Sequence, residues 1–223
     1  MWLIHQFPLC PFSRKVRLLL GEKGVGYELV REHPWERRDE FVDLNPAGRT
    51  PVMVESDKNI TLIDSVAICE YFEETIDKAP MISGTATNRA EIRRLTAWFD
   101  QQFFGAVVEP LMSERMLKRL VHRASPDTGV LREAMKAANG MLDYADYLLD
   151  HRNWLAGATL SLADLTAAAH ISVADYLGGI DWRAHEQTRN WYSGLKSRPS
   201  FRPMLAERMG VIAPPTDYDK VDF

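Results

Sequence analysis

The fold is decided by residues 45–52, which read Asn45-Pro46-Ala47-Gly48-Arg49-Thr50-Pro51-Val52. The first four residues are a turn sequence, because Pro and Gly between structured segments favour turns. Pro51 opens a short apolar segment over residues 51–54, and a second apolar segment follows at residues 60–62 after a polar turn. Short apolar segments bounded by turn residues are typical of strands. This stretch therefore predicts a turn followed by two adjacent strands.

Strands and helices alternate around this pair of strands. Upstream, the pattern predicts a strand, a helix, a strand and a charged helical region, at residues 2–6, 12–23, 27–30 and 35–44. Gly24 ends the first of these helices, as a glycine with positive φ does. Downstream, Asp64 or Ser65 can cap a helix that runs to residue 76. Residues 1–80 are therefore predicted to follow the order β-α-β-α-β-β-α.

Beyond residue 80 the pattern is helical. Ser161 and Asp164 have the spacing of a capping box in front of an almost wholly apolar segment. The predicted helices are a long one over residues 88–123, bent at Pro110, and others over residues 129–150, 165–177, 191–196 and 201–208. The predicted fold class is α/β plus all-α. Its parts are a first domain at residues 1–80, an all-helical domain at residues 88–209 and a C-terminal tail at residues 210–223.

The composition excludes several classes of protein. The 223 residues include 27 basic and 31 acidic side chains, a formal net charge of −4, whereas nucleic-acid binders are usually basic. Two cysteines are too few for a disulfide scaffold, and the six histidines show no ligand spacing, so we expect no metal. The longest apolar stretch, residues 165–174, is about half a membrane span. We therefore expect a cytoplasmic protein that binds no nucleic acid and does not insert into membranes.

Four short motifs occur in an informative order along the chain. They are Cys10-Pro11-Phe12-Ser13 between the first strand and the first helix, residues 45–52, the pair Asp64-Ser65, and the capping box from Ser161 to Asp164. On these motifs the whole chain resembles the cytosolic glutathione transferase superfamily. The resemblance implies a thioredoxin-like N-terminal domain followed by an all-helical domain. It also implies a homodimer, with glutathione as co-substrate if the protein is catalytic.

Cys10 and Ser13 are the candidate catalytic residues. Cys10 precedes the first predicted helix, where free N–H groups and the helix dipole favour an anion, and Arg14, Lys15 and Arg17 add positive charge. The resemblance implies that a Cys10 thiolate forms a mixed disulfide with glutathione. Alternatively, Ser13 donates a hydrogen bond to the sulfur of bound glutathione. A third interpretation makes Cys10 a small buried residue in a tight turn.

The resemblance also implies where glutathione binds. Pro51, if its peptide bond is cis, turns the N–H and C=O of Thr50 outward, so that Thr50, Pro51 and Val52 pair with the cysteinyl part of the ligand. Asp64 would take the ammonium of the γ-glutamyl end, and Ser65 would take its carboxylate. The alternative is that Pro51 is only a kink and that Asp64 and Ser65 only cap a helix. The glycyl carboxylate has two candidate partners, Arg38 and Arg49.

Three further segments indicate which branch of the superfamily the chain resembles. Residues 31–36, 195–203 and 218–223 are similar to those of a branch of the superfamily, the transferase-like division regulators of alphaproteobacteria. That branch is understood to act by binding FtsZ filaments rather than by catalysis. The resemblance therefore leaves two functions open. One is a glutathione-dependent enzyme with conjugation or thiol-transfer chemistry, and the other is a non-catalytic FtsZ-binding regulator at the division site.

Three features are candidate contact surfaces for a protein partner. The first is a basic stripe on one helix face, either a docking site or a solvated surface, which comprises Arg115, Lys118, Arg119, His122 and Arg123. The second is Trp35, which either anchors a partner or fills the gap over the sheet. The third is the tail, which carries Tyr218, Asp222 and Phe223 among acidic residues. The tail is a contact segment, a disordered end or a strap folded onto its own domain.

Overall fold

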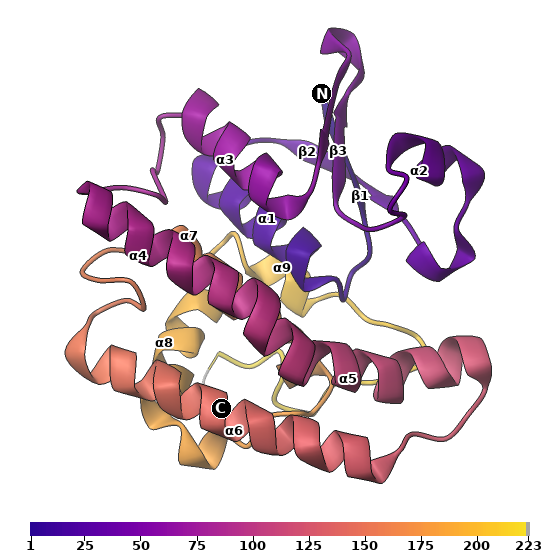
Figure 1. Ribbon diagram of the computed structural model, residues 1–223, viewed down its shortest axis with the longest axis vertical. Coiled ribbons are helices and arrows are strands. Elements are labelled where there is room, and N and C mark those ends of the chain that lie inside the picture. The colour runs from indigo at the N-terminus through magenta and orange to yellow at the C-terminus, as the bar shows by residue number, and fades with distance from the viewer. Residues whose placement is uncertain (222–223) are drawn as a thin grey trace.

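The computed structural model describes residues 1–221, and Figure 1 shows an α/β layer above a helical layer. The predicted order of the N-terminal elements is confirmed, with two short 3₁₀ turns added. The elements of the α/β layer are β1 (Trp2–Gln6), α1 (Pro11–Lys23), β2 (Tyr27–Arg31), η1 (Pro34–Glu36), α2 (Asp39–Leu44), β3 (Val52–Glu55), η2 (Ser56–Lys58), β4 (Ile60–Ile63) and α3 (Ser65–Thr75).

The four strands form one mixed sheet in the order β2-β1-β3-β4. β1 runs parallel to β2 and antiparallel to β3, and β3 runs antiparallel to β4. His5, near the end of β1, pairs with Val52 at the beginning of β3. The loop that leaves β1 and the loop that enters β3 therefore meet at the same edge of the sheet. This register brings residues 7–10 and residues 49–51 together.

The helical layer begins with a long, continuous helix, which confirms the predicted helix over residues 88–123, while the bend expected at Pro110 stays a prediction. Its segments η3 and η4 have the wider hydrogen bonding of a π-helix, and Pro110, which has no N–H to donate, lies between them. The elements of this layer are α4 (Ala86–Trp98), η3 (Phe99–Val108), α5 (Glu109–Leu111), η4 (Met112–His122), α6 (Thr128–His151), α7 (Leu162–Tyr176), η5 (Trp182–Ala184), α8 (Glu186–Lys196) and α9 (Arg202–Leu205).

Helix α7 lies at the centre of the molecule, and every residue of it is buried. Its N-terminus confirms the predicted capping box. The Asp164 carboxylate accepts hydrogen bonds from the Ser161 N–H at 3.0 Å and the Ser161 hydroxyl at 2.7 Å. Its other oxygen accepts from the Leu155 N–H at 2.9 Å and the Trp191 indole N–H at 3.0 Å. These bonds compensate for removing the carboxylate from water, and burial still raises its pKa.

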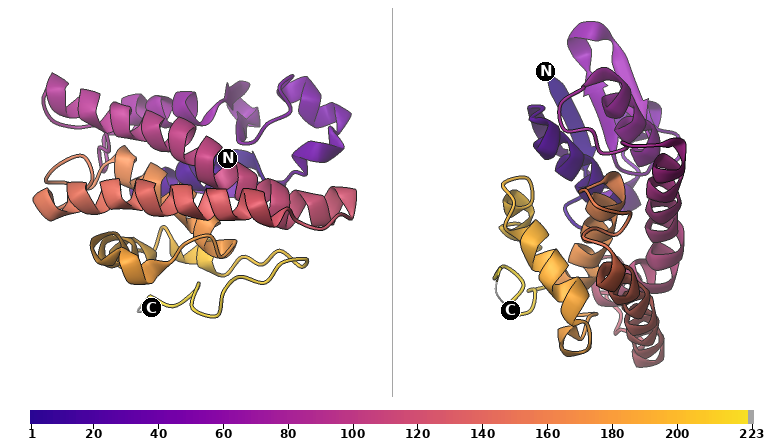
Figure 2. Two further views of the ribbon diagram at one scale, coloured as in Figure 1. Left: turned by 60° about the horizontal axis from the view of Figure 1, so that its bottom comes forward. Right: turned by 90° about the vertical axis from the view of Figure 1, so that its left-hand side faces the viewer.

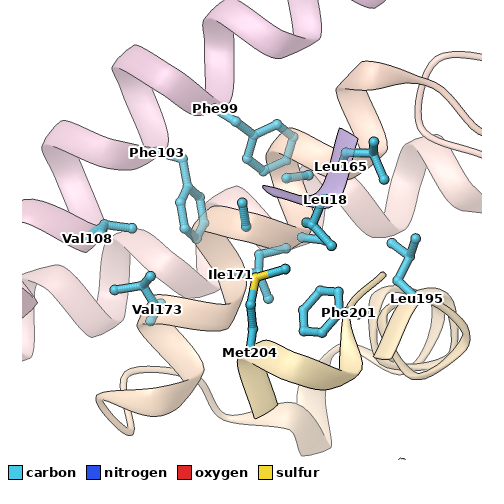
Figure 3. Packing of buried hydrophobic residues seen from close by; sticks show 14 of the residues in the cluster. Leu18, Phe99, Phe103, Val108, Leu165, Ile171, Val173, Leu195, Phe201 and Met204 are labelled. Carbon is cyan, nitrogen blue, oxygen red and sulfur yellow. The ribbon is translucent and has the colours of Figure 1, made fainter. Parts of the chain in front are cut away.

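One hydrophobic cluster joins the two layers. Leu18 of α1 lies among side chains of the helical layer, including Leu165 and Ile171 of α7 and Phe201 beside α9 (Figure 3). The C-terminal segment returns along the outside of the helical layer (Figure 2), and the Ser193 hydroxyl of α8 donates to the Val221 carbonyl at 2.6 Å. Among the described residues no helix has the length and apolar character that a membrane crossing needs.

Some boundaries differ from the sequence-based expectations. Helix α8 begins at Glu186 rather than at residue 191, because the Asp146 carboxylate accepts from the Thr188 N–H and hydroxyl, each at 2.7 Å. This cap comes from a residue 42 positions away, so the local sequence does not reveal it. The charged region at residues 35–44 is two short helices, interrupted where Arg37 takes a φ of 46°. Helix α9 is shorter than predicted and ends at Leu205.

Candidate functional site

Two adjoining cavities lie where the β1–α1 loop meets the loop that enters β3. We call them the apolar cleft, of about 310 Å³, and the polar cavity, of about 510 Å³. The apolar cleft is lined by Phe7, Cys10, Pro11, Phe12, Pro34, Trp35, Arg49, Thr50, Phe104, Glu109, Met112, Met116 and Leu117. The polar cavity is lined by Phe12, Asn45, Ala47, Arg49, Thr50, Pro51, Ile63, Asp64 and Ser65. Phe12, Arg49 and Thr50 line both, so the two cavities form one site.

Cys10 lies at the N-cap of α1 and lines the apolar cleft. Its side chain is 8% exposed, and its Sγ donates to the Thr50 carbonyl at 3.4 Å. The thiol therefore sits against the backbone that precedes Pro51, on the sheet edge predicted for a peptide ligand. Ser13 lies one turn further into α1, is fully buried and lines neither cavity in the described part of the chain. Of the two candidate catalytic residues, only Cys10 borders the site.

The basic residues that follow Cys10 point toward the helical layer. Arg14 donates to the Pro8 carbonyl at 2.8 Å and to the Ser172 hydroxyl at 2.7 Å, and all of its side chain is buried. Arg17 forms an ion pair of 2.7 Å with Glu207. The sequence suggested that these charges surround the thiol. In the structure they are used in the contact between the two layers.

Lys15 takes part in a buried charge cluster beneath Phe12. Its Nζ lies 2.5 Å from an Asp100 oxygen, and the other Asp100 oxygen lies 3.0 Å from His170 Nε2. Burial alone would raise the pKa of Asp100, but the Lys15 charge and the His170 contact lower it overall. Burial lowers the pKa of His170. The Phe12 ring, which borders both cavities, packs edge-on against His170, so this cluster supports the wall of the site.

The loop that enters β3 has the predicted cis bond between Thr50 and Pro51. Asn45 fixes this loop, because its amide donates to the Arg49 carbonyl at 2.7 Å and its oxygen accepts from the Ala47 N–H at 3.1 Å. The local sequence indicates Asn45 only as a turn residue. Val52 is fully buried in the sheet, so it can offer only its backbone to a ligand.

Asp64 and Ser65 lie at the N-terminus of α3 and line the polar cavity. The exposed Asp64 carboxylate accepts from the Val66 N–H at 2.7 Å and the Ala67 N–H at 3.4 Å, so the predicted helix cap is confirmed. Asp64 has a φ of 77°, a conformation that costs energy for a residue other than glycine. Such outliers cluster at ligand sites, and this one places a carboxylate on the rim of the cavity.

The two arginine candidates for a ligand carboxylate differ in position. Arg49 lines both cavities and forms no side-chain ion pair within residues 1–221. Arg38 pairs with Glu32 at 2.7 Å and with Glu40 at 3.0 Å, and the cavity walls described above do not include it. Arg49 is therefore the cation available to a ligand.

Trp35 is half-buried and forms a wall of the apolar cleft. Its ring stacks on His33 with centroids 5.1 Å apart, and it meets Phe7 edge-on at 5.2 Å. Trp35 was predicted either to anchor a partner or to fill the gap over the sheet. In the structure it is packed on one side and borders a cavity on the other.

The predicted basic stripe is only partly exposed. Arg115 is half-buried and donates to the Leu177 carbonyl at the end of α7, and Lys118 pairs with Glu114 at 2.6 Å. Arg119 is exposed and donates to the Val211 carbonyl at 3.2 Å, while His122 and Arg123 are also exposed. Residues on a π-helix do not keep the spacing of an α-helix, which explains why the stripe does not stay on one face.

The tail is folded onto its own domain as far as the structure describes it. Tyr218 is 1% exposed, accepts a hydrogen bond from Arg14 at 3.1 Å and packs edge-on against Tyr176 at 5.1 Å. Asp219 pairs with Arg208 at 2.7 Å. The predicted contact residues Asp222 and Phe223 lie outside the described residues. Tyr218 is thus part of the core.

The fold and these two cavities define a class of protein, and comparison with known proteins agrees. The family model for the N-terminal domain of glutathione S-transferases matches residues 9–75. A curated relative, FtsZ-localized protein A of Caulobacter vibrioides, is 44% identical over 99% of this chain and 97% of its own. The chain therefore belongs to the glutathione S-transferase family.

Two further comparisons define its place in the family. The crystal structure of a glutathione S-transferase from Rhodospirillum rubrum F11 is 44% identical and superposes with a TM-score of 0.97, with all of both chains covered. Glutathione S-transferase 2 of Saccharomyces cerevisiae is 27% identical over 92% of this chain and 90% of its own. The similarity to FtsZ-localized protein A is thus much greater than that to the yeast transferase.

Proposed function

We propose that this protein associates with FtsZ and regulates cell division at the division site, with the transferase fold as its scaffold. The observation that carries the proposal is the 44% identity to FtsZ-localized protein A, which extends over nearly the full length of both chains. A shared fold alone would not support it, because one fold hosts many functions. Identity at this level over nearly the full length of both chains supports a shared partner as well.

We assign the contact with FtsZ to the basic end of η4, which we define as Arg119, Val121, His122 and Arg123. All four side chains are exposed, and Val121 is an apolar residue that is 41% exposed. Clustered cations beside an exposed apolar side chain suit an acidic protein segment, because charge steers the encounter and apolar contact stabilises it. Arg115, Lys118, Trp35 and the tail take no part in this assignment.

The experiment that tests this contact uses charge reversal. A variant with Arg119→Glu and Arg123→Glu should co-sediment with assembled FtsZ filaments about tenfold more weakly than the wild type. Arg183→Glu is the control for one charge reversal elsewhere on the surface, because Arg183 is 89% exposed and lies in η5, in another part of the chain. Circular dichroism should show equal melting temperatures for all three proteins. Unchanged co-sedimentation of the double variant would contradict the assignment.

The site itself favours a second function, glutathione binding with thiol chemistry at Cys10. The supporting observation is that a polar cavity with one exposed anion, one unpaired cation and a helix N-terminus adjoins a thiol. In this proposal Asp64 takes the ligand ammonium, Ser65 the γ-glutamyl carboxylate and Arg49 the glycyl carboxylate. The backbone of Thr50 pairs with the cysteinyl part, which brings the ligand sulfur toward Cys10.

Calorimetric titration of glutathione tests this second function. We expect binding near 0.1 mM, about −5.5 kcal/mol, which weakens in Cys10→Ala and in Asp64→Asn. Ser13→Ala should bind as the wild type does, because Ser13 borders neither cavity in residues 1–221. Absence of heat up to about 10 mM would remove the enzyme interpretation, since weaker binding has no meaning at cellular glutathione levels.

We also propose that the protein is a cytoplasmic homodimer with domains at residues 1–80 and 88–209. Family membership supports the dimer, and the change from mixed to all-helical structure after α3 supports the division. Light scattering after size exclusion should give twice the mass of the chain. A mass equal to one chain at micromolar concentration would contradict the dimer.

A further inference from the structure

The rim of the apolar cleft carries one basic and one acidic side chain, and their surroundings differ. Among residues 1–221, the lining of the cleft contains two charged side chains, Arg49 and Glu109, beside aromatic, methionine, proline and other uncharged residues. Glu109 is the first residue of α5, and its side chain is exposed. Within the described residues it forms no ion pair or side-chain hydrogen bond. Its carboxylate is thus available to a molecule in the cleft.

Arg49 and Glu109 do not have the same surroundings. Arg49 borders both cavities, whereas Glu109 borders only the apolar cleft. A ligand carboxylate in the polar cavity can therefore pair with Arg49, as proposed for glutathione. Glu109 is then the one charge among the cleft's lining residues, within the described part of the chain, that has no partner. A negative rim beside apolar walls attracts a cation, and the attraction is stronger where the walls exclude water.

The walls of the cleft suit the same kind of molecule. Phe12 and Phe104 lie with ring centroids 4.9 Å apart, and Trp35 forms another wall. Aromatic faces bind apolar bodies and also attract cations. Met112 and Met116 adapt their shape to an irregular ligand. A volume of about 310 Å³ is at the low end for small-molecule pockets, so one aromatic ring with a short chain fits it.

We propose that the apolar cleft selects small apolar molecules that carry a cationic group, and that Glu109 sets this preference. The apolar body lies against Phe12, Phe104 and Met116, and the cation lies beside the Glu109 carboxylate. The pairing of Arg49 with an anion rests on the proposed glutathione site. The second ligand of that site is thus an aryl-alkyl amine or a molecule of that class.

Three probes of similar size and different charge test the preference. They are 4-phenylbutylamine, 4-phenylbutanol and 4-phenylbutyrate, each titrated calorimetrically with and without glutathione. The wild type should bind the amine about fivefold more tightly than the alcohol. Glu109→Gln should lose most of this preference, with the affinity for the alcohol unchanged. The control Glu186→Gln, which removes an exposed carboxylate from the start of α8, should keep the preference.

Alkylation of Cys10 by iodoacetamide shows where the probes bind. Cys10 lines the cleft, so a bound amine should slow its alkylation. Cys69 does not interfere, because it is buried and burial raises its pKa to about 12. With glutathione present, equal affinities for the three probes, tightest binding of the carboxylate, or no binding of any probe would each overturn the proposal. The probes are also titrated without glutathione, and glutathione is titrated alone. A failure of glutathione to bind is therefore distinguished from a failure of the probes to bind.

Discussion

The guanidinium of Arg14 donates a hydrogen bond to the phenol oxygen of Tyr218 over 3.1 Å, although the two residues are 204 positions apart in the chain. Arg14 also donates to the Pro8 carbonyl, in the loop that leads to Cys10. The C-terminal segment is therefore connected, through one buried side chain, to the loop that carries the site thiol. The segment belongs to the folded body as far as Tyr218.

Truncating Tyr218 should destabilise the protein strongly. Tyr218→Ala should lower the free energy of unfolding by about 3–5 kcal/mol, because it opens a cavity in the core. Tyr218→Phe should cost about 1–3 kcal/mol, because it removes one hydrogen-bond partner of a buried guanidinium. Urea denaturation measures both. Tyr147, which is 61% exposed, provides the control, and its change to Ala should cost far less. Equal costs at the two positions would contradict a docked tail.

The ion pair between Lys15 of α1 and Asp100 of η3 gives a second prediction. Lys15→Met should lower the free energy of unfolding by about 3–5 kcal/mol, because it leaves the Asp100 carboxylate buried without its cation. Lys118→Met breaks the partly exposed pair with Glu114 and should cost about 1 kcal/mol or less. Chemical denaturation of both variants checks the contrast. A cost for Lys15→Met no greater than that for Lys118→Met would show that the pair does not hold the layers together.

Asp64, which caps the N-terminus of α3 at the candidate site, gives a third prediction. Asp64→Asn keeps an acceptor for the Val66 N–H and a residue that tolerates positive φ, so the melting temperature should not change. It removes the charge assigned to the ligand ammonium, so glutathione should bind about fivefold more weakly. Asp64→Ala should also lose about 1 kcal/mol of stability with the cap. Unchanged glutathione affinity in Asp64→Asn would mean that Asp64 is only a cap.

A buried carboxylate in α7 gives a pH dependence. Burial raises the pKa of Asp175 from 3.8 to about 6, despite its hydrogen bond from Trp182 at 2.9 Å. Between these values the unfolded chain has lost the proton that the folded protein keeps. The contribution of Asp175 to stability is therefore full below about pH 4 and is lost as the pH rises through about 6, a loss of about 3 kcal/mol.

Comparison with Asp175→Asn isolates this effect. The free energy of unfolding of the wild type, minus that of the variant, should fall as the pH rises from 4 to 7, because the amide does not titrate. Denaturation at several pH values measures the difference. A difference that stays constant over this range would mean that Asp175 is not the group responsible.

The parts of the fold that local sequence determines could be predicted. The Asp64 cap, the Ser161–Asp164 capping box and the turn before Pro51 each depend on residues a few positions apart. The start of α8 could not be predicted, because its cap is the distant residue Asp146. The burial of a long, nearly wholly apolar helix was also predictable, since α7 has no polar face to expose.

The sequence predicts which loops and helix ends form the candidate site, but it does not predict the partners of the charged side chains. Cys10, Thr50, Asp64 and Ser65 come together because β1, β3 and β4 are neighbours in the sheet. The distant partners of Arg14 and Lys15 on the helical layer are not visible in the local sequence. Glu109 was missed for the same reason, since only the packing of the two layers places α5 at the cleft.

Co-sedimentation with FtsZ tests the central claim most directly. The purified protein is mixed with assembled FtsZ filaments and, in parallel, with FtsZ kept unassembled, and both mixtures are centrifuged. Association with FtsZ predicts that the protein pellets with the filaments, that the bound amount saturates at a fixed ratio to FtsZ, and that none pellets without filaments. Protein that stays in the supernatant at all concentrations up to about 100 µM, a range that covers even weak complexes, would contradict the account.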